Sequence, residues 1–235
     1  MALPKLNSNP KYELNVPSTG TKVRFRPFLV KEEKALMIAM ESGNQKDALN
    51  GLVDTIHACA VDNLDTGMLT TFDIEYIFLQ LRTKSVGETA NVNLKCTSCG
   101  TVNKITIPLD DIKVDVPDID KKIQLDTDIS IEVDWPRFKD VVEMGGNDVS
   151  NADSAFNVIG SCIKAIYTAD ERINVNEVSK EELQEFLESM NSAQFSKLKD
   201  FVELIPKLKH DVSFSCKNCA SSNNITVEGV ESFLL

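Results

Sequence analysis

The chain has 235 residues, of which 42% are hydrophobic and 26% are charged, as in a globular protein that buries its own core. Its net charge of −11 disfavours a role that depends on the phosphate backbone of nucleic acid. No apolar run is long enough to cross a bilayer, and the first residues lack the apolar core of a signal peptide. We therefore expect synthesis in a reducing cytoplasm, where paired cysteines indicate metal binding more than disulfides.

Charge is distributed unevenly along the chain. Residues 1–35 carry seven Lys/Arg against three Glu, a net charge of +4. Residues 110–153 carry thirteen Asp/Glu against five Lys/Arg, a net charge of −8. Solvated surfaces commonly carry such blocks. The alternative interpretation is a polar molecule that docks its basic arm on one protein neighbour and its acidic segment on another.

The first part of the chain is predicted to be an extended arm, a hairpin and helices. Alternating apolar residues on both sides of a Pro-Ser-Thr-Gly turn predict a hairpin over residues 12–26. Apolar periodicity predicts helices over residues 31–42, 46–61 and the stretch from Thr70 or Thr71 to about Arg82. The apolar positions expected to share a face are Leu36 and Met40 in the first helix and Leu49, Val53, Ile56 and Ala60 in the second.

The middle of the chain returns to strands and then to helices. Residues 108–121 are acidic, contain two prolines and are predicted to form a loop, and residues 123–133 a hairpin. A short helical stretch is expected after Trp135-Pro136, with a break at Gly145-Gly146. Strong helical periodicity covers residues 153–167. Two further helices are expected, one after the capping box Ser179-Lys-Glu-Glu182 and one from Ser192 to about Pro206.

Two Cys-x-x-Cys pairs, Cys96/Cys99 and Cys216/Cys219, each lie where alternation on both sides predicts the turn of a hairpin. Two such turns supply four thiolates, and a tetrahedral set of four thiolates suits Zn²⁺ in a closed, structural site. Iron bound by the same four sulfurs is the less favoured metal. Two separate disulfides and free thiols are the alternatives without a metal.

The separation of the two pairs sets the predicted domain organisation. Residues 100–215 lie between them, whereas common zinc ribbons separate their pairs by about 15–20 residues. We therefore expect an α+β fold in which a split zinc ribbon closes around an insert. The predicted parts are an arm and hairpin (1–30), a helical domain (31–88), a split zinc ribbon (89–109 and 210–230) and an acidic, mostly helical insert (110–209).

No catalytic constellation accompanies the cysteines, so we expect a protein that is not an enzyme. The chain has two histidines, no Gly-rich phosphate loop and no Gly-x-Ser-x-Gly motif. The competing interpretation is a zinc-ribbon protein that binds nucleic acid or regulates. It predicts basic, aromatic knuckles, whereas the nearby residues of these kinds are Lys95, Lys104, Phe214 and Lys217.

The run from Phe72-Asp73-Ile74-Glu75 through Arg82-Thr83-Lys84-Ser85-Val86-Gly87-Glu88 leads directly into the first cysteine pair. Together with Leu3-Pro4-Lys5 and Val23-Arg24-Phe25-Arg26-Pro27-Phe28, it resembles the baseplate hub subunit family of T4-like contractile-tailed bacteriophages. The resemblance is clearest over residues 1–110 and returns at the C-terminal cysteine pair. Arg82 and Ser85 are polar positions of this run, and we expect them to cap and pack the joint between helix and ribbon.

The resemblance implies a structural or assembly protein of the tail baseplate, made and assembled in the cytoplasm of the host. It implies contacts with other hub or wedge proteins in a symmetric tail assembly, and neither nucleic acid nor membrane as a partner. Both a permanent component of the virion and a transient assembly factor fit this expectation.

Overall fold

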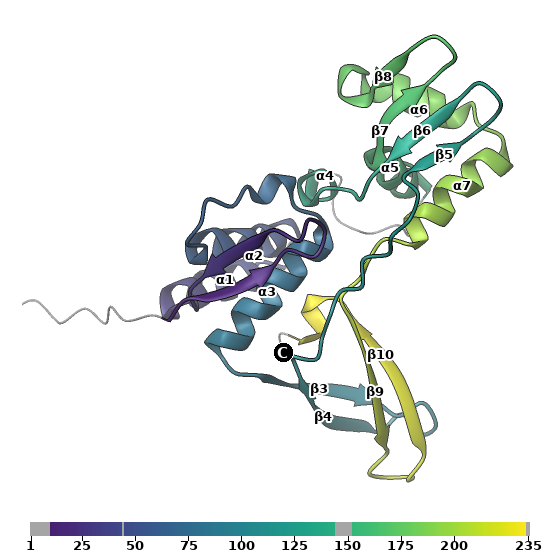
Figure 1. Cartoon of the computed structure of the whole chain (residues 1–235). Coiled ribbons are helices and arrows are strands. Elements are labelled where there is room, and N and C mark those ends of the chain that lie inside the picture. The colour runs from purple at the N-terminus through teal and green to yellow at the C-terminus, as the bar shows by residue number, and fades with distance from the viewer. Residues whose placement is uncertain (1–9, 44, 144–151, 234–235) are drawn as a thin grey trace, which may run out of the picture. The chain divides into compact units, whose positions relative to one another are not determined.

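The computed structural model describes residues 10–43, 45–143 and 152–233 of the chain. Helices and strands are mixed along these residues, in agreement with the predicted α+β class (Figure 1). The chain divides into two compact units, each with its own internal packing. Unit 1 takes in residues 1–66, 72–115 and 207–235, and unit 2 takes in residues 67–71 and 116–206.

Unit 1 begins with the hairpin that alternation predicts over residues 12–26. Its strands are β1 (Tyr12–Asn15) and β2 (Lys22–Phe25), which pair antiparallel. Val23 and Phe25 are buried, whereas Lys22 and Arg24 are exposed. This is the expected result, because successive side chains of a strand point to opposite faces.

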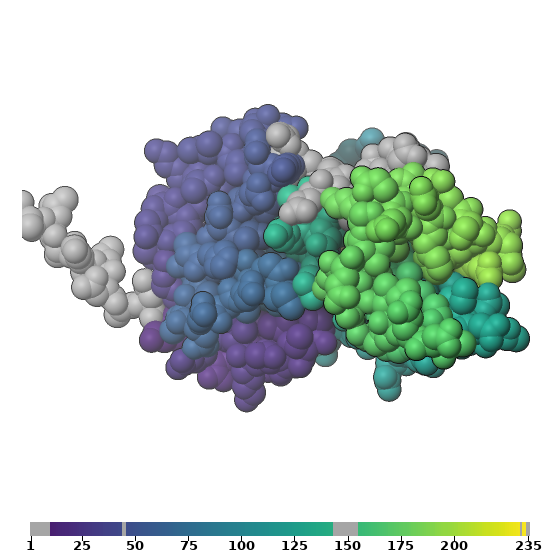
Figure 2. All heavy atoms as spheres, turned by 90° about the horizontal axis from the view of Figure 1, so that it is seen from above, coloured from purple at the N-terminus to yellow at the C-terminus, as the bar shows by residue number. Residues whose placement is uncertain are grey.

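Three helices complete this part of unit 1, and their atoms form one continuous body with the hairpin, coloured purple to blue in Figure 2. The helices are α1 (Val30–Glu41), α2 (Gln45–Cys59) and α3 (Thr71–Ser85). Helix α3 is the most buried of the three, with eight of its fifteen residues buried. It continues to Ser85, almost one turn beyond the predicted end near Arg82.

The apolar faces of α1 and α2 differ from the predicted ones. Leu36 is buried as expected, but Met40 is 40% exposed. The reason is that α1 approaches α2 through Ala39, so closely that a Cβ added at Gly51 would lie 2.8 Å from the Cβ of Ala39. In α2 the buried apolar residues are Leu52, Ile56 and Cys59, whereas the predicted Leu49 and Val53 are half-buried.

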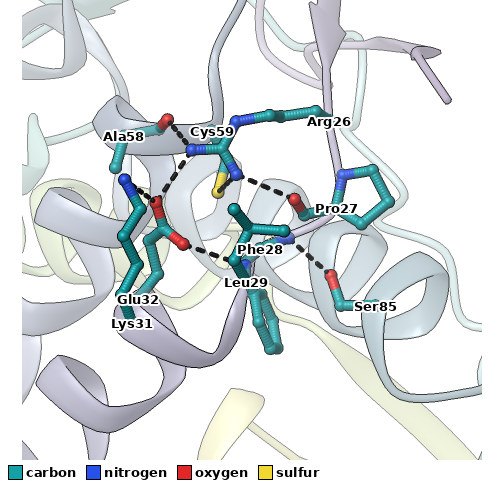
Figure 3. A network of polar contacts seen from close by, with 9 residues as sticks. All are labelled: Arg26, Pro27, Phe28, Leu29, Lys31, Glu32, Ala58, Cys59 and Ser85. Carbon is teal, nitrogen blue, oxygen red and sulfur yellow. Dashed lines mark hydrogen bonds and ion pairs between the residues drawn. The ribbon is translucent and has the colours of Figure 1, made fainter. Parts of the chain in front are cut away.

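An ion pair between Arg26 and Glu32 fixes the start of α1 (Figure 3). Nη2 of Arg26 donates to Oε1 of Glu32 at 2.8 Å and to the carbonyl oxygen of Ala58 at 2.8 Å. Oε2 of Glu32 accepts the backbone N–H of Leu29 at 2.9 Å, which satisfies a donor at the exposed start of the helix. The pair therefore joins the end of β2 to the first turn of α1 and the last turn of α2.

Arg82 and Ser85 lie where α3 leads into the first strand of the ribbon. The hydroxyl of Ser85 accepts the backbone N–H of Phe28 at 2.9 Å and donates to the carbonyl oxygen of Leu81 at 2.5 Å. Nη1 of Arg82 donates to the carbonyl oxygen of Gly87 at 3.3 Å. Both side chains thus hold backbone groups of their own chain, as the capping and packing interpretation predicts.

Two further hairpins of unit 1 carry the cysteine pairs and lie side by side in Figure 1. Their strands are β3 (Thr89–Lys95) with β4 (Val102–Pro108), and β9 (Lys209–Ser215) with β10 (Ser222–Glu228). In the first hairpin Thr89 pairs with Pro108. In the second hairpin Lys209 pairs with Glu228, and both of these residues lie 120 positions after their counterparts. The alternation of buried and exposed residues is identical over residues 91–108 and 211–228. The hairpins are therefore two copies of one structural unit.

The described residues of unit 2 form a four-stranded antiparallel sheet of order β5-β6-β7-β8 and four α-helices. The strands are β5 (Lys122–Gln124), β6 (Ser130–Val133), β7 (Ile163–Tyr167) and β8 (Arg172–Asn174). The helices are α4 (Phe138–Glu143), α5 (Ala152–Cys162), α6 (Lys180–Glu188) and α7 (Ser192–Glu203). Ile131 and Val133 are fully buried, and Trp135 stacks on Phe201 with ring centroids 4.9 Å apart. Unit 2 thus has a core of its own.

The helix predicted over residues 153–167 is wrong in its second part. Helix α5 ends at Cys162, and the next five residues form β7, which pairs with both β6 and β8. Ile163 and Ile166, expected on the inner face of a helix, are instead buried in the central part of a sheet. Pairing on both edges satisfies the backbone of this segment, and a continuous apolar run is compatible with either structure.

Three local predictions for unit 2 agree with the structure. The hairpin over residues 123–133 is β5–β6, and the short helix after Trp135-Pro136 is α4. The capping box at Ser179 begins α6. The expected break at Gly145-Gly146 and the extended arm of residues 1–9 lie outside the described residues. In the part of the chain that the structure describes, no helix is long and apolar enough to span a membrane.

Candidate metal centre

Each cysteine pair lies in the turn of its hairpin, where two backbone hydrogen bonds fold the chain back. In the first turn the N–H of Cys96 donates to the carbonyl of Thr101 at 2.9 Å, and that of Gly100 donates to the carbonyl of Cys96 at 2.9 Å. The second turn repeats both bonds at 2.9 Å, from Cys216 to Ser221 and from Ala220 to Cys216. We name these turns knuckle 1 (residues 96–101) and knuckle 2 (residues 216–221).

Both knuckles need a left-handed residue directly after the second cysteine. Gly100 has φ 71°, and Ala220 at the equivalent position has φ 57°. Among the described residues, Ala220 is the only one other than glycine with a positive φ. A left-handed residue with a Cβ costs roughly 1–2 kcal/mol. Knuckle 2 therefore holds this conformation against local strain.

The structure brings the four predicted cysteines together. Their Sγ atoms all lie within 4.8 Å of one another. The two distances between knuckles are 3.7 Å for Cys96 to Cys219 and 3.6 Å for Cys99 to Cys216. Cys96 and Cys216 are buried, whereas Cys99 and Cys219 are exposed. Residues 120 positions apart thus form one cluster with equivalent places in the two hairpins.

These distances fit the ligand set of a metal ion. A disulfide places its sulfurs about 2.05 Å apart, whereas the distances from Cys96 to Cys219 and from Cys99 to Cys216 are 3.7 Å and 3.6 Å. A tetrahedral ion that is about 2.3 Å from each sulfur places the sulfurs about 3.8 Å apart. The cluster is therefore compatible with a four-thiolate metal site without a large movement of either knuckle.

The ionisation of the cluster is uneven. Hydrogen bonds from the hydroxyl and the backbone N–H of Thr101 lower the pKa of Cys99 to about 6. The N–H of Ser221 acts to lower the pKa of Cys219. Desolvation and hydrogen bonds among the crowded sulfurs act in the opposite direction and outweigh it, so the pKa of Cys219 is raised to about 12. Negative charge already present on a neighbour opposes a second thiolate. A cation at the centre of the four sulfurs removes this opposition, since it favours every thiolate.

N–H groups of the knuckles also point at sulfur. The backbone N–H of Asn218 donates to Sγ of Cys216 at 3.5 Å, and its side-chain amide donates to Sγ of Cys99 at 3.8 Å. Backbone N–H groups of Cys219 and Asn218 lower the pKa of Cys216. Such donors stabilise thiolates and are typical of the shell around metal-bound sulfur.

Two buried asparagines beside the cluster were not singled out from the sequence. Asn103 and Asn223 are 3% and 2% exposed, and each follows the second cysteine of its pair by four positions. Their side chains contact the knuckle of the opposite hairpin. The available signal was the repeat itself, because the same residue type recurs at the same place in both copies.

The family described as T4 bacteriophage base plate protein matches residues 9–235, nearly the whole chain. The chain belongs to this family. No curated protein and no solved structure matches it. The resemblance to T4-like baseplate proteins is thus confirmed, and the match covers both hairpins as well as the residues between them.

Membership of this baseplate family identifies a structural component of a bacteriophage baseplate. It implies contacts with other baseplate proteins and a place in the tail of the virion. The cysteine cluster therefore belongs to a structural protein of the baseplate.

Proposed function

We propose that the chain is a non-enzymatic structural or assembly component of the baseplate hub, stabilised by one structural Zn²⁺ bound by Cys96, Cys99, Cys216 and Cys219. The observation that carries the proposal is the cluster of four sulfurs from two cysteine pairs that are separated by 116 residues of sequence. A closed set of four protein ligands leaves no coordination position for a substrate, so the role of the ion is structural. Iron is the less favoured occupant of the same site.

In this proposal the hairpins at 89–109 and 210–230 are the halves of one zinc ribbon, and residues 110–209 are an insert between them. The arm and hairpin of residues 1–30 and the helical domain of residues 31–88 precede the ribbon. Support comes from the repeat of pairing, burial and knuckle hydrogen bonds at a constant separation along the chain. A metal shared by the halves would join the two ends of the insert.

The exposed face of α1 supports a role in assembly. Val30 is 78% exposed, Met37 is 55% exposed and Ile38 is 59% exposed. Exposed apolar groups that gather on one surface commonly mark contact sites for other proteins. We propose other hub or wedge proteins as partners in a symmetric tail assembly, rather than nucleic acid or membrane, and host cytoplasm as the place of assembly.

Metal analysis of the purified chain tests the site. We expect about one equivalent of zinc, and its loss in Cys96→Ser and Cys216→Ser. Each variant is also expected to lose at least about 3 kcal/mol of stability, because zinc binding contributes about 10–16 kcal/mol in small zinc-binding peptides. Cys162→Ala removes a buried thiol outside the cluster and is the control that keeps its zinc. Less than half an equivalent of zinc in the parent, with unchanged melting of both serine variants, would contradict the proposal.

Mass spectrometry of purified virions tests the place of the chain. A permanent component of the hub is expected in the tail fraction in a fixed ratio to other baseplate proteins. Absence from virions, combined with a requirement for the chain during tail formation, would reduce the role to that of an assembly factor. A chain that is dispensable for tail formation would contradict both versions.

A further inference from the structure

Asn103 and Asn223 connect the two hairpins through reciprocal hydrogen bonds. Oδ1 of Asn103 accepts the backbone N–H of Lys217 at 2.9 Å, inside knuckle 2. Oδ1 of Asn223 accepts the backbone N–H of Thr97 at 2.8 Å, inside knuckle 1, and also the hydroxyl of Thr97 at 2.9 Å. Each asparagine therefore holds the residue that follows the first cysteine of the other pair.

The amide nitrogens of the same side chains bind their own hairpins. Nδ2 of Asn103 donates to the carbonyl of Thr101 at 2.8 Å, and Nδ2 of Asn223 donates to the carbonyl of Ser221 at 2.8 Å. Nδ2 of Asn103 also lies 3.7 Å from Sγ of Cys216. Each side chain thus uses a donor on its own knuckle and an acceptor on the opposite one, which a short planar amide can do at once.

These contacts matter because they are buried. Both asparagines are almost fully inaccessible to water, so a broken contact leaves a polar group with no solvent to replace its partner. A buried polar group that loses its partner destabilises the folded state. The two asparagines therefore resist any separation of the knuckles, and with it any separation of Cys96 and Cys99 from Cys216 and Cys219.

We propose that Asn103 and Asn223 are positioning residues that hold the four thiolates in register across the two hairpins, each by fixing the knuckle that it does not belong to. This rests on the metal site of the proposed function and adds residues that bind no metal themselves. Because residues 109–208 separate the hairpins along the chain, direct contacts between the hairpins place the ligands of one pair relative to the other, and the hydrogen bonds of the two buried asparagines are among these contacts.

Metal affinity provides the first test, on the full chain, by competition of a chromogenic chelator for Zn²⁺. Asn103→Ala and Asn223→Ala are each expected to bind zinc about 10–100-fold more weakly, the usual effect of removing a group that orients metal ligands. The Co²⁺ form is expected to keep the absorption of a tetrahedral four-thiolate site, because all four sulfurs remain.

Matched controls are Thr106→Val and Thr226→Val. Each removes an exposed side-chain hydrogen bond inside one hairpin, to Asn91 and to Asp211 respectively, at equivalent places in the repeat. Their zinc affinity is expected to stay within twofold of the parent. The controls separate a general loss of hairpin stability from the loss of bracing between the hairpins.

Hydrogen exchange in the zinc-loaded chain provides a readout that general destabilisation does not reproduce. Asn103→Ala is expected to lose protection at the N–H of Lys217 and keep it at Thr97, and Asn223→Ala is expected to show the reverse. Loss at both amides in both variants would indicate simple loosening and overturn the proposal.

The outcomes distinguish this inference from the proposed function. A parent chain that binds neither Zn²⁺ nor Co²⁺ through four sulfurs overturns the metal site and the bracing role together. A parent that binds metal normally, with alanine variants that bind it within twofold of the controls, overturns only the role of the asparagines. Weaker binding together with crossed loss of amide protection supports it.

Discussion

At the scale of single residues, the two knuckles differ at the position that adopts a left-handed backbone. Ala220 holds φ 57° where the other copy has a glycine. Ala220→Gly removes a strain of roughly 1–2 kcal/mol, offset by roughly 0.5–1 kcal/mol of extra entropy in the unfolded chain. We expect a gain of about 0.5–1 kcal/mol in the free energy of unfolding, measured by denaturant titration.

Gly100→Ala is the matched reverse substitution. A Cβ at Gly100 meets nothing within 4 Å, so the cost of this variant comes from the backbone alone. It is expected to lose about as much stability as Ala220→Gly gains. Equal effects of the same sign in the two variants would show that the copies do not share one backbone conformation.

The Arg26–Glu32 pair predicts a dependence of stability on pH. Burial raises the pKa of Glu32, but hydrogen bonds from Arg26, the N–H of Leu29 and Lys31 outweigh it, so the pKa is lowered overall. The stabilisation is therefore fully present above the unfolded pKa of about 4.3. It is lost as the pH falls through the lower pKa of the folded state.

Unfolding measured from pH 7 to pH 3 in the parent and in Glu32→Gln checks this pair. At pH 7 the variant is expected to be less stable by about 1.5–3 kcal/mol, the range for hydrogen bonds to charged groups. The difference is expected to shrink toward pH 3, because the parent becomes protonated at Glu32 while the variant does not titrate there. A difference that stays constant over this range would contradict the assignment.

At the scale of elements, the contact of α1 with α2 depends on the absence of a side chain at Gly51. A Cβ there would lie 2.8 Å from the Cβ of Ala39, so Gly51→Ala must push the helices apart. We expect a loss of about 1–3 kcal/mol, although alanine is the better helix former by about 1 kcal/mol. Thermal unfolding measures this change.

Gly160→Ala in α5 is the control for helix propensity. A Cβ at Gly160 would lie 3.5 Å from Cδ2 of Leu183, an ordinary contact distance. This variant is expected to be neutral or more stable by up to about 1 kcal/mol. A similar loss of stability in Gly51→Ala and Gly160→Ala would show that close packing at Gly51 is not the cause.

Local patterns predicted most elements, and the failures occur where distant contacts decide. The hairpins and the cap of α6 follow from alternation, turn residues and side chains within a few positions. Strand β7 was missed, because its structure depends on pairing with β6 and β8 rather than on its own periodicity. Met40 was placed inward for a related reason, since the small residues Ala39 and Gly51 set how α1 meets α2.

The candidate site was predictable at the level of its sulfur atoms and not beyond. Spacing and the two strand contexts identified the four cysteines, because that motif is short and local. The bracing by Asn103 and Asn223 was not predicted, since each side chain binds a residue more than 110 positions away. A polar residue after a knuckle has no local pattern that distinguishes an exposed side chain from a buried one.

At the scale of the whole molecule, metal removal is expected to act on the hairpins and to spare unit 2. Ile131, Val133 and Ala165 in the sheet of unit 2 are fully buried, and none of the four clustered cysteines belongs to that unit. Chelation is expected to remove amide protection from β3, β4, β9 and β10 while β6 and β7 stay protected. Hydrogen exchange with mass spectrometry measures this, and simultaneous loss in both units would contradict the separation.

In mechanical terms, two of the passages of the chain between the units, after Asp115 and before Lys207, lead directly into the ribbon. The chain leaves unit 1 after Asp115 and returns at Lys207, and a bridge between Lys113 and Lys209 holds the two crossings together. The crossings continue into β4 and β9, whose ends carry Cys99 and Cys216, 3.6 Å apart. A metal bound there would tie β4 to β9 at the end away from the Lys113–Lys209 bridge, so a force that separates these two strands would have to break metal–sulfur bonds as well as the bridge.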